Sequence, residues 1–165
     1  MMMQYLGDGD KTEYSPPPDQ ALNVYNAVFD SGSTSHLLKP SCLPTDSEIY
    51  SSKGATIRTA LSDSTMPAFG RVSPGILTDS LVVSDNLLTK NLVSIPKLDR
   101  AGYTTIFGNG EAAVTDRDGN VIARAPLKHS DLYEFDIRQL FNQVETSLLG
   151  SALLDDNDIT TWHLR

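Results

Sequence analysis

Cysteine is almost absent from this chain of 165 residues, which contains only Cys42. A single thiol excludes an internal disulfide and a metal cluster of the Cys-x-x-Cys type. Cys42 stands between Ser41 and Leu43 without a neighbouring histidine, so we expect a packed or loop thiol rather than a nucleophile. The low cysteine use fits a reducing compartment, and the N-terminus has no basic stretch followed by an apolar core. Together these features predict an intracellular, cytoplasmic location.

Long apolar runs and basic residues are also scarce. No apolar run approaches the roughly 18 residues that a membrane-spanning helix needs, so we expect no membrane insertion. The chain contains 13 lysines and arginines and 21 acidic residues, which gives a net charge of −8. Such a chain repels phosphate backbones, so direct nucleic-acid binding is not expected. The hydrophobic content of 39% is typical of a soluble globular domain with a core of its own.

Turn residues divide the chain into short segments. Residues 1–21 contain Pro16-Pro17-Pro18 and several Gly and Asp residues, which predicts a flexible tail. From residue 22 onward, short apolar runs separated by turn residues predict a mainly β protein. We expect strands over residues 23–29, 35–38, 55–61, 66–72, 75–83 and 91–94. The turn at 62–64 would join two of them into a hairpin.

The second half of the chain carries signals for helices and hairpins. Ser94 is a good helix N-cap, Pro96 fits a first helical turn and Gly102 a helix end, which predicts one short helix between them. The strands expected at 103–107, 112–115 and 121–124 are joined by Asn109-Gly110 and Asp118-Gly119-Asn120, and they predict a β-meander over 102–137. A second helix is expected within residues 138–165, with an apolar face made by Leu140, Phe141, Val144 and Leu148.

The segment Asp30-Ser31-Gly32-Ser33 carries the clearest chemical signal. It directly follows the apolar run 24–29, so a strand would deliver the Asp30 carboxylate into a tight turn. Such a carboxylate can accept hydrogen bonds from the backbone N–H groups of the turn and face a second carboxylate. The short motif also arises by chance, and an ordinary turn at a strand end is the alternative. His36, a few residues later, is expected to be packed or solvated without a catalytic role.

The ordered set of motifs resembles the protease region of copia-type retrotransposon Pol polyproteins, relatives of retroviral proteases. The motifs that carry the resemblance are Val28-Phe29-Asp30-Ser31-Gly32-Ser33, the hairpin region 56–70, Leu81-Val82-Val83, Asn91-Leu92-Val93-Ser94-Ile95-Pro96-Lys97-Leu98, Gly102-Tyr103-Thr104-Thr105-Ile106-Phe107, residues 116–123 and Asp131-Leu132-Tyr133. The resemblance implies a retropepsin-like closed β-barrel with a flap hairpin over residues 22–101. The meander would then be an extension of that domain.

The resemblance also implies an aspartic endopeptidase that cleaves polyprotein peptides. Only one Asp-Ser/Thr-Gly occurs in the chain, so a second catalytic aspartate would come from another copy in a C2 homodimer. Asp30, Ser31 and Gly32 would form the catalytic turn, with Ser31 hydrogen-bonded across the dimer and Gly32 allowing close approach. Ser33, Leu92, Val93 and Ser94 would support that turn. The flap would comprise Ala60, Leu61, Ser62, Asp63 and Ser64.

Two positions depart from the family pattern. The flap tip has no glycine, and Ser33 stands where related proteases commonly have alanine. A hydroxyl at residue 33 could donate a hydrogen bond to the Asp30 carboxylate and favour its charged form, and we expect an acidic pH optimum. The glycine-free flap keeps open a catalytically inactive retropepsin-like module that serves as a structural or binding unit.

The ending Trp162-His163-Leu164-Arg165 resembles the opening of the pre-integrase segment that follows the protease in such polyproteins. In that family a histidine at the position of His163 begins a zinc cluster, but the other ligands are absent here, so we expect no metal site and no cofactor. The resemblance implies that the chain is part of a longer polyprotein, with residues 138–165 forming a helix and a truncated start of the next segment.

Overall fold

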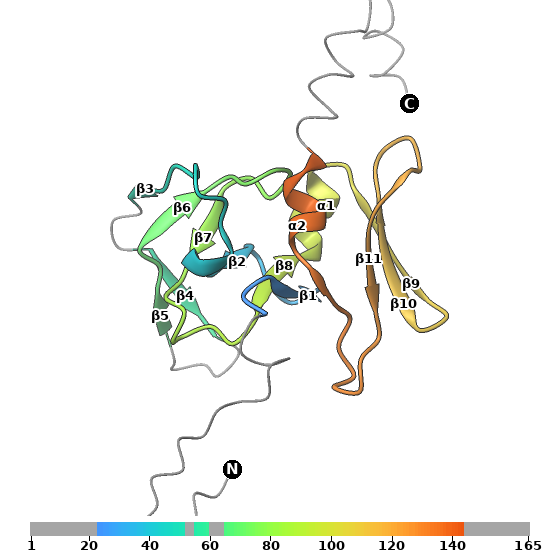
Figure 1. Ribbon diagram of the computed structural model, residues 1–165, viewed down its shortest axis with the longest axis horizontal. Coiled ribbons are helices and arrows are strands. Elements are labelled where there is room, and N and C mark those ends of the chain that lie inside the picture. Colours follow the sequence, from blue (N-terminus) through green and yellow to red (C-terminus); the bar gives the residue numbers. More distant parts are fainter. Residues whose placement is uncertain (1–22, 52–54, 60–64, 144–165) are drawn as a thin grey trace, which may run out of the picture.

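The computed structural model describes residues 23–51, 55–59 and 65–143, and these residues form a mainly β protein with two short helices, as expected (Figure 1). The strands are β1 (Asn26–Asp30), β2 (Leu37–Leu38), β3 (Tyr50–Ser51), β4 (Thr56–Arg58), β5 (Thr65–Pro67), β6 (Gly70–Val72), β7 (Ser80–Val82), β8 (Asn91–Ser94), β9 (Thr104–Gly108), β10 (Glu111–Thr115), β11 (Val121–Pro126) and β12 (Glu134–Asp136). The helices are α1 (Ile95–Arg100) and α2 (Arg138–Phe141), and Pro40–Cys42 forms one 3-10 turn. The predicted tail 1–21, the flap tip 60–64 and residues 144–165 lie outside the described residues.

A seven-stranded sheet in the order β12-β1-β8-β2-β7-β6-β3 forms the larger part of the fold. β1 lies between β8, its parallel neighbour, and β12, its antiparallel neighbour. In the described residues β12 and β3 end the ladder on opposite sides, so these pairings do not close the expected barrel. β12 covers the outer edge of β1, and β3 pairs with β6 at the opposite end of the sheet.

The predicted hairpin is present at its base, where β4 and β5 pair in antiparallel register from Thr56 opposite Pro67 to Arg58 opposite Thr65. The expectation of one continuous strand over 66–72 is wrong. The chain changes sheets at residues 68–69, where the Ala68 N–H donates to Ala55 O and the Phe69 N–H donates to Val82 O. Because consecutive N–H groups bind different neighbours, β5 belongs to the hairpin and β6 to the large sheet.

The expected strand 75–83 is shorter than predicted, since only β7 is extended. Gly75 adopts a φ of +57° and Asp79 a φ of +52°, values that turn the chain twice before β7. Ile76 and Leu77 are buried in this turn, so their apolar character reports core packing and not a strand. The Ser80 hydroxyl donates to Leu77 O at 2.6 Å and holds the second turn.

The meander and α1 follow the local signals closely, and α2 lies at the start of the second expected helix, whose positions 144 and 148 are outside the described residues. β11, β10 and β9 form an antiparallel three-stranded sheet, and Asn109 and Gly110 both have positive φ values in the tight turn between β9 and β10. Ser94 caps α1, and Gly102 follows its end with a φ of +93°. Figure 1 shows both helices beside the meander, where α1 contacts β9 and α2 contacts β11.

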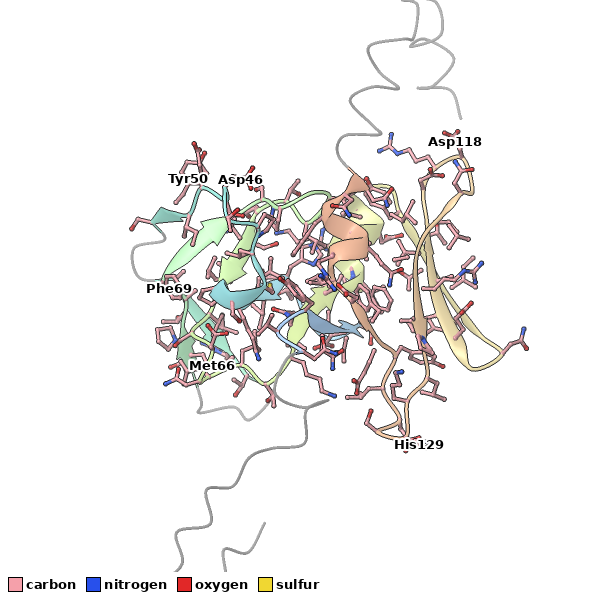
Figure 2. All side chains as sticks on the ribbon, viewed as in Figure 1. Asp46, Tyr50, Met66, Phe69, Asp118 and His129 are labelled. Atoms are coloured by element: carbon pink, nitrogen blue, oxygen red, sulfur yellow. The ribbon has the colours of Figure 1, made fainter. Side chains whose placement is uncertain are left out.

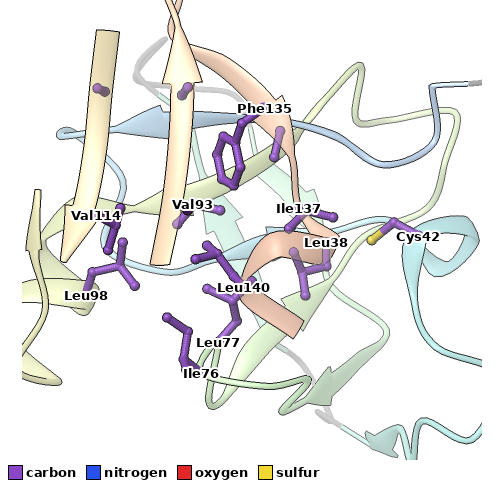
Figure 3. Packing of buried hydrophobic residues seen from close by; sticks show 14 of the residues in the cluster. Leu38, Cys42, Ile76, Leu77, Val93, Leu98, Val114, Phe135, Ile137 and Leu140 are labelled. Carbon is purple, nitrogen blue, oxygen red and sulfur yellow. The ribbon is translucent and has the colours of Figure 1, made fainter. Parts of the chain in front are cut away.

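One apolar core joins the large sheet to the meander. Figure 3 shows side chains from the sheet, the helices and the meander converging on it, and its fully buried members include Leu38, Leu77, Leu98, Val114 and Leu140. Each buried leucine of this kind contributes about 1.5 to 3 kcal/mol by transfer from water. The meander is therefore held to the sheet by shared burial. Neither helix in the described part of the chain has the length and apolar composition of a membrane-spanning helix.

Candidate active site

The Asp30 carboxylate lies at the C-terminal end of β1, where the strand runs into the turn 31–35. Asp30 is half-buried, and its Oδ1 accepts a hydrogen bond from the Gly32 N–H at 2.8 Å. This bond fixes the carboxylate over its own turn, as aspartate side chains commonly do two residues before a backbone donor. Ser31 and Gly32 are exposed. The strand end thus presents a constrained carboxylate at the surface of the single chain.

Ser94 connects this turn to β8. Asp30 pairs with Ser94 in the parallel register of β1 and β8, and Ser94 is fully buried. The Ser94 hydroxyl donates to Ser33 O at 2.5 Å and accepts from the Lys97 N–H at 3.2 Å. One side chain therefore caps α1 and holds the far side of the Asp30 turn.

His36 completes the connection and was given no role by the sequence. Its side chain is 1% exposed, and its Nδ1 accepts a hydrogen bond from the Ser94 N–H at 3.0 Å. Burial lowers the pKa of His36 from 6.5 to about 4, and the positive charge of Lys97 acts in the same direction. The imidazole is therefore neutral near pH 7. The one sequence signal for this role is its place between the Asp30 turn and the buried pair Leu37-Leu38.

The hydroxyl of Ser33 does not play the part expected of it. It donates to Ser35 O at 2.6 Å rather than to the Asp30 carboxylate. The backbone turns between residues 33 and 35, which brings that carbonyl oxygen within reach of the hydroxyl. The donor that does reach the carboxylate is the Gly32 amide, and the Ser33 hydroxyl instead stabilises the turn through the Ser35 carbonyl.

Asn91 is a second supporting residue that sequence reasoning missed. It is fully buried, its Oδ1 accepts from the Lys39 N–H at 2.9 Å, and its Nδ2 donates to Val24 O at 2.8 Å and to Asn26 O at 3.0 Å. These bonds join the start of β8 to the segments around β1 and β2. An asparagine at the start of an apolar strand was the available signal, because a buried amide requires several partners.

The residues expected to support the turn lie beside it. Leu92 and Val93 pair with Val28 and Phe29 in the same parallel ladder, with Val93 fully buried and Leu92 half-buried. Leu92 also packs against a small second core that receives Ile57 and Met66 from the hairpin. β8 therefore pairs with the Asp30 strand, and Leu92 packs against the same small core as the base of the predicted flap. The flap tip, Ala60 to Ser64, lies outside the described residues.

Exposed apolar side chains lie near the base of the hairpin. Phe69 is 52% exposed and Tyr50 is 62% exposed, and Figure 2 shows both, together with Met66, on the side of the molecule away from the meander. These residues come from β3, β5 and the segment between β5 and β6. Two large apolar side chains near the hairpin base are thus exposed to solvent.

No group of three histidine, cysteine or acidic side chains suited to a metal ion occurs within the described ranges. No family model, curated protein or solved structure matches this chain. The candidate site consequently depends on the geometry of Asp30, His36, Asn91 and Ser94.

Proposed function

We propose that this chain is an aspartic endopeptidase of a retropepsin-like kind, active as a homodimer and acting on peptide segments of a polyprotein. The observation that carries the proposal is the Asp30 turn. A carboxylate at a strand end is oriented by its own turn and tied through Ser94 to the neighbouring parallel strand. A general acid or base needs such orientation because small displacements of a reacting group cost large factors in rate.

The chemistry requires two carboxylates, one from each copy. When two such groups lie within hydrogen-bond reach they share one proton, since both cannot be charged together. The charged carboxylate removes a proton from a water molecule, which attacks the peptide carbonyl, while the protonated one donates to the carbonyl oxygen. The need for one shared proton predicts an acidic pH optimum.

Gly32 supplies a reason to expect a second copy. A Cβ added at Gly32 would lie 3.4 Å from Asp30 Oδ1, an ordinary contact distance, and Gly32 does not have a positive φ. The single chain therefore has room for a side chain at this exposed position. A side chain at residue 32 would, however, obstruct a backbone that approaches from a second copy. Glycine at this position therefore suits a symmetric contact between two turns.

The test compares Asp30→Asn with Asp99→Asn in the full chain. Asp99 is an exposed acid on α1, so its substitution changes the net charge equally without touching the turn. On a peptide library at acidic pH, we expect Asp30→Asn to lose at least about 1,000-fold in cleavage rate and Asp99→Asn to match the wild type. The wild-type rate per mole of chain should rise with chain concentration as dimers form. Equal cleavage by wild type and Asp30→Asn would refute the proposal.

A second function is a binding module without catalysis. The observation that favours it is that the turn forms within the single chain, through the Gly32 and Ser94 hydrogen bonds, and needs no second copy to hold its shape. Absence of cleavage by wild type and by both variants, at acidic and neutral pH, would support this function over the peptidase.

A further inference from the structure

We infer that His36, neutral and carrying its proton on Nε2, is a positioning residue that ties the Asp30 turn to the end of β8 through the Ser94 amide. Where the inference concerns catalysis it rests on the proposed peptidase function. Its structural part concerns one buried hydrogen bond and can be tested on the single chain.

The path of the chain makes this bond important. β8 lies between β1 and β2 in the sheet, so the segment 31–36 crosses the C-terminal end of β8. On one side Asp30 pairs with Ser94, and on the other Leu37 pairs with Leu92. Ser94 is fully buried, so its N–H needs an acceptor inside the protein. The Nδ1 of His36 supplies that acceptor at 3.0 Å.

The middle and the C-terminal end of the crossing segment are therefore held by the same residue. Ser94 binds His36 through its N–H and Ser33 through its hydroxyl. Asp30, whose carboxylate accepts a hydrogen bond from the Gly32 N–H, directly precedes this segment. A change at His36 would reach the carboxylate through Ser94 and the turn, without any contact between His36 and a substrate.

The protonation state of His36 decides whether the bond exists. Nδ1 accepts a hydrogen bond only while it carries no proton, and a protonated imidazole has two donors and no acceptor. The titratable groups on or next to the surrounding elements are Asp30 at the end of β1, Lys39 after β2, Asp79 before β7, and Lys97, Asp99 and Arg100 on α1. Of these, Lys97 is the one whose charge shifts the pKa of His36, and together with burial it favours the neutral form.

Two substitutions separate the hydrogen bond from simple packing. In His36→Asn the amide Oδ1 can occupy the position of Nδ1, so an acceptor remains, while His36→Leu fills similar space without one. Loss of the acceptor leaves a buried donor unpaired. In the full chain near pH 7, we expect the Ser94 amide to exchange with solvent at least about tenfold faster in His36→Leu, with the Val114 amide of β10 as the reference for global opening. The Asn variant should recover most of the protection.

A second measurement holds even if His36→Leu does not fold. In the wild type near pH 7, the imidazole ¹⁵N shifts should show a proton on Nε2 and a hydrogen-bonded, unprotonated Nδ1. A proton on Nδ1, or unchanged Ser94 exchange in a folded His36→Leu chain, would overturn the inference.

The catalytic readout is separate. His36→Leu should lower kcat with little change in KM, because it displaces the carboxylate without removing a substrate contact, and His36→Asn should restore most of kcat. If the exchange and ¹⁵N results hold while no variant cleaves peptides, the positioning role stands and the proposed peptidase function falls. If peptides are cleaved and His36→Leu matches the wild type in kcat, the positioning role in catalysis is refuted and the peptidase function stands.

Discussion

Acidification should destabilise this protein through His36 before most carboxylates respond. The pKa of His36 is lowered from 6.5 to about 4, first by burial and then by Lys97. Between these values the unfolded chain binds a proton at His36 and the folded chain does not, so the free energy of unfolding falls as pH decreases from 6.5 to 4. The contribution of His36 to the free energy of unfolding is fully present above pH 6.5. Below pH 4 this group causes no further loss of stability.

The magnitude follows from the size of the shift. A pKa lowered from 6.5 to about 4 corresponds to about 3 kcal/mol, a large fraction of the roughly 5 to 15 kcal/mol that stabilises a typical domain. Glu134 acts in a different range, because its hydrogen bond from Lys90 lowers its pKa from 4.5 to about 2, so its contribution is lost between those values. Between pH 6.5 and 4.5, the loss in the free energy of unfolding therefore comes mainly from His36.

Urea denaturation at pH 7.0, 6.0, 5.0 and 4.5 measures this effect directly, with His36→Asn as the matched control. Asparagine does not titrate, so the variant should lose much less stability than the wild type between pH 7.0 and 4.5. The difference between the two slopes should approach one proton per molecule near pH 5. Parallel curves for the two proteins would refute the assignment of a buried, neutral histidine to this site.

Three further outcomes are expected from stability and reactivity measurements. Asn91→Leu should lower the free energy of unfolding by about 3 kcal/mol or more, measured by urea denaturation, because three backbone groups lose their partner; a change below about 1 kcal/mol would contradict this. Gly75→Ala should cost about 2 kcal/mol or more, since φ is +57° and a Cβ would clash with the Leu140 carbonyl. Gly110→Ala, also at positive φ but with open space, is its control and should cost less. Cys42, whose pKa burial raises to about 12, should resist alkylation at pH 8 until the protein unfolds, and rapid labelling of the folded chain would contradict its burial.

Local signals predicted the meander and α1 well. The Asn109-Gly110 turn and the Ser94 cap depend on residues a few positions apart, and their preferred backbone angles lead to the meander and to α1. The long strand expected at 75–83 failed because burial of Ile76 and Leu77 in a turn produces the same apolar pattern as a strand. Apolar character alone does not distinguish these two outcomes.

Sequence reasoning found the Asp30 turn and its neighbour Ser94 but assigned no role to His36 or Asn91. The motif was recognisable because a strand followed by Asp-Ser-Gly is a local pattern. The hydrogen bonds of His36 and Asn91 join positions 52 to 67 residues apart, and no local pattern encodes them. The Ser33 hydroxyl was assigned to the wrong acceptor because the path of residues 33–35 could not be seen in the sequence.

The sequence by itself therefore determined the β-rich class, the turns, the helix cap and the position of the carboxylate after its strand, since each depends on neighbouring residues. Only the tertiary structure decided that β8 lies between β1 and β2 and that β12 covers the outer edge of β1. It also decided that a buried histidine and a buried asparagine support the turn. The reason is physical: strand order and the partners of buried polar groups are set by packing across the whole core, where burial and hydrogen-bond satisfaction must be met together.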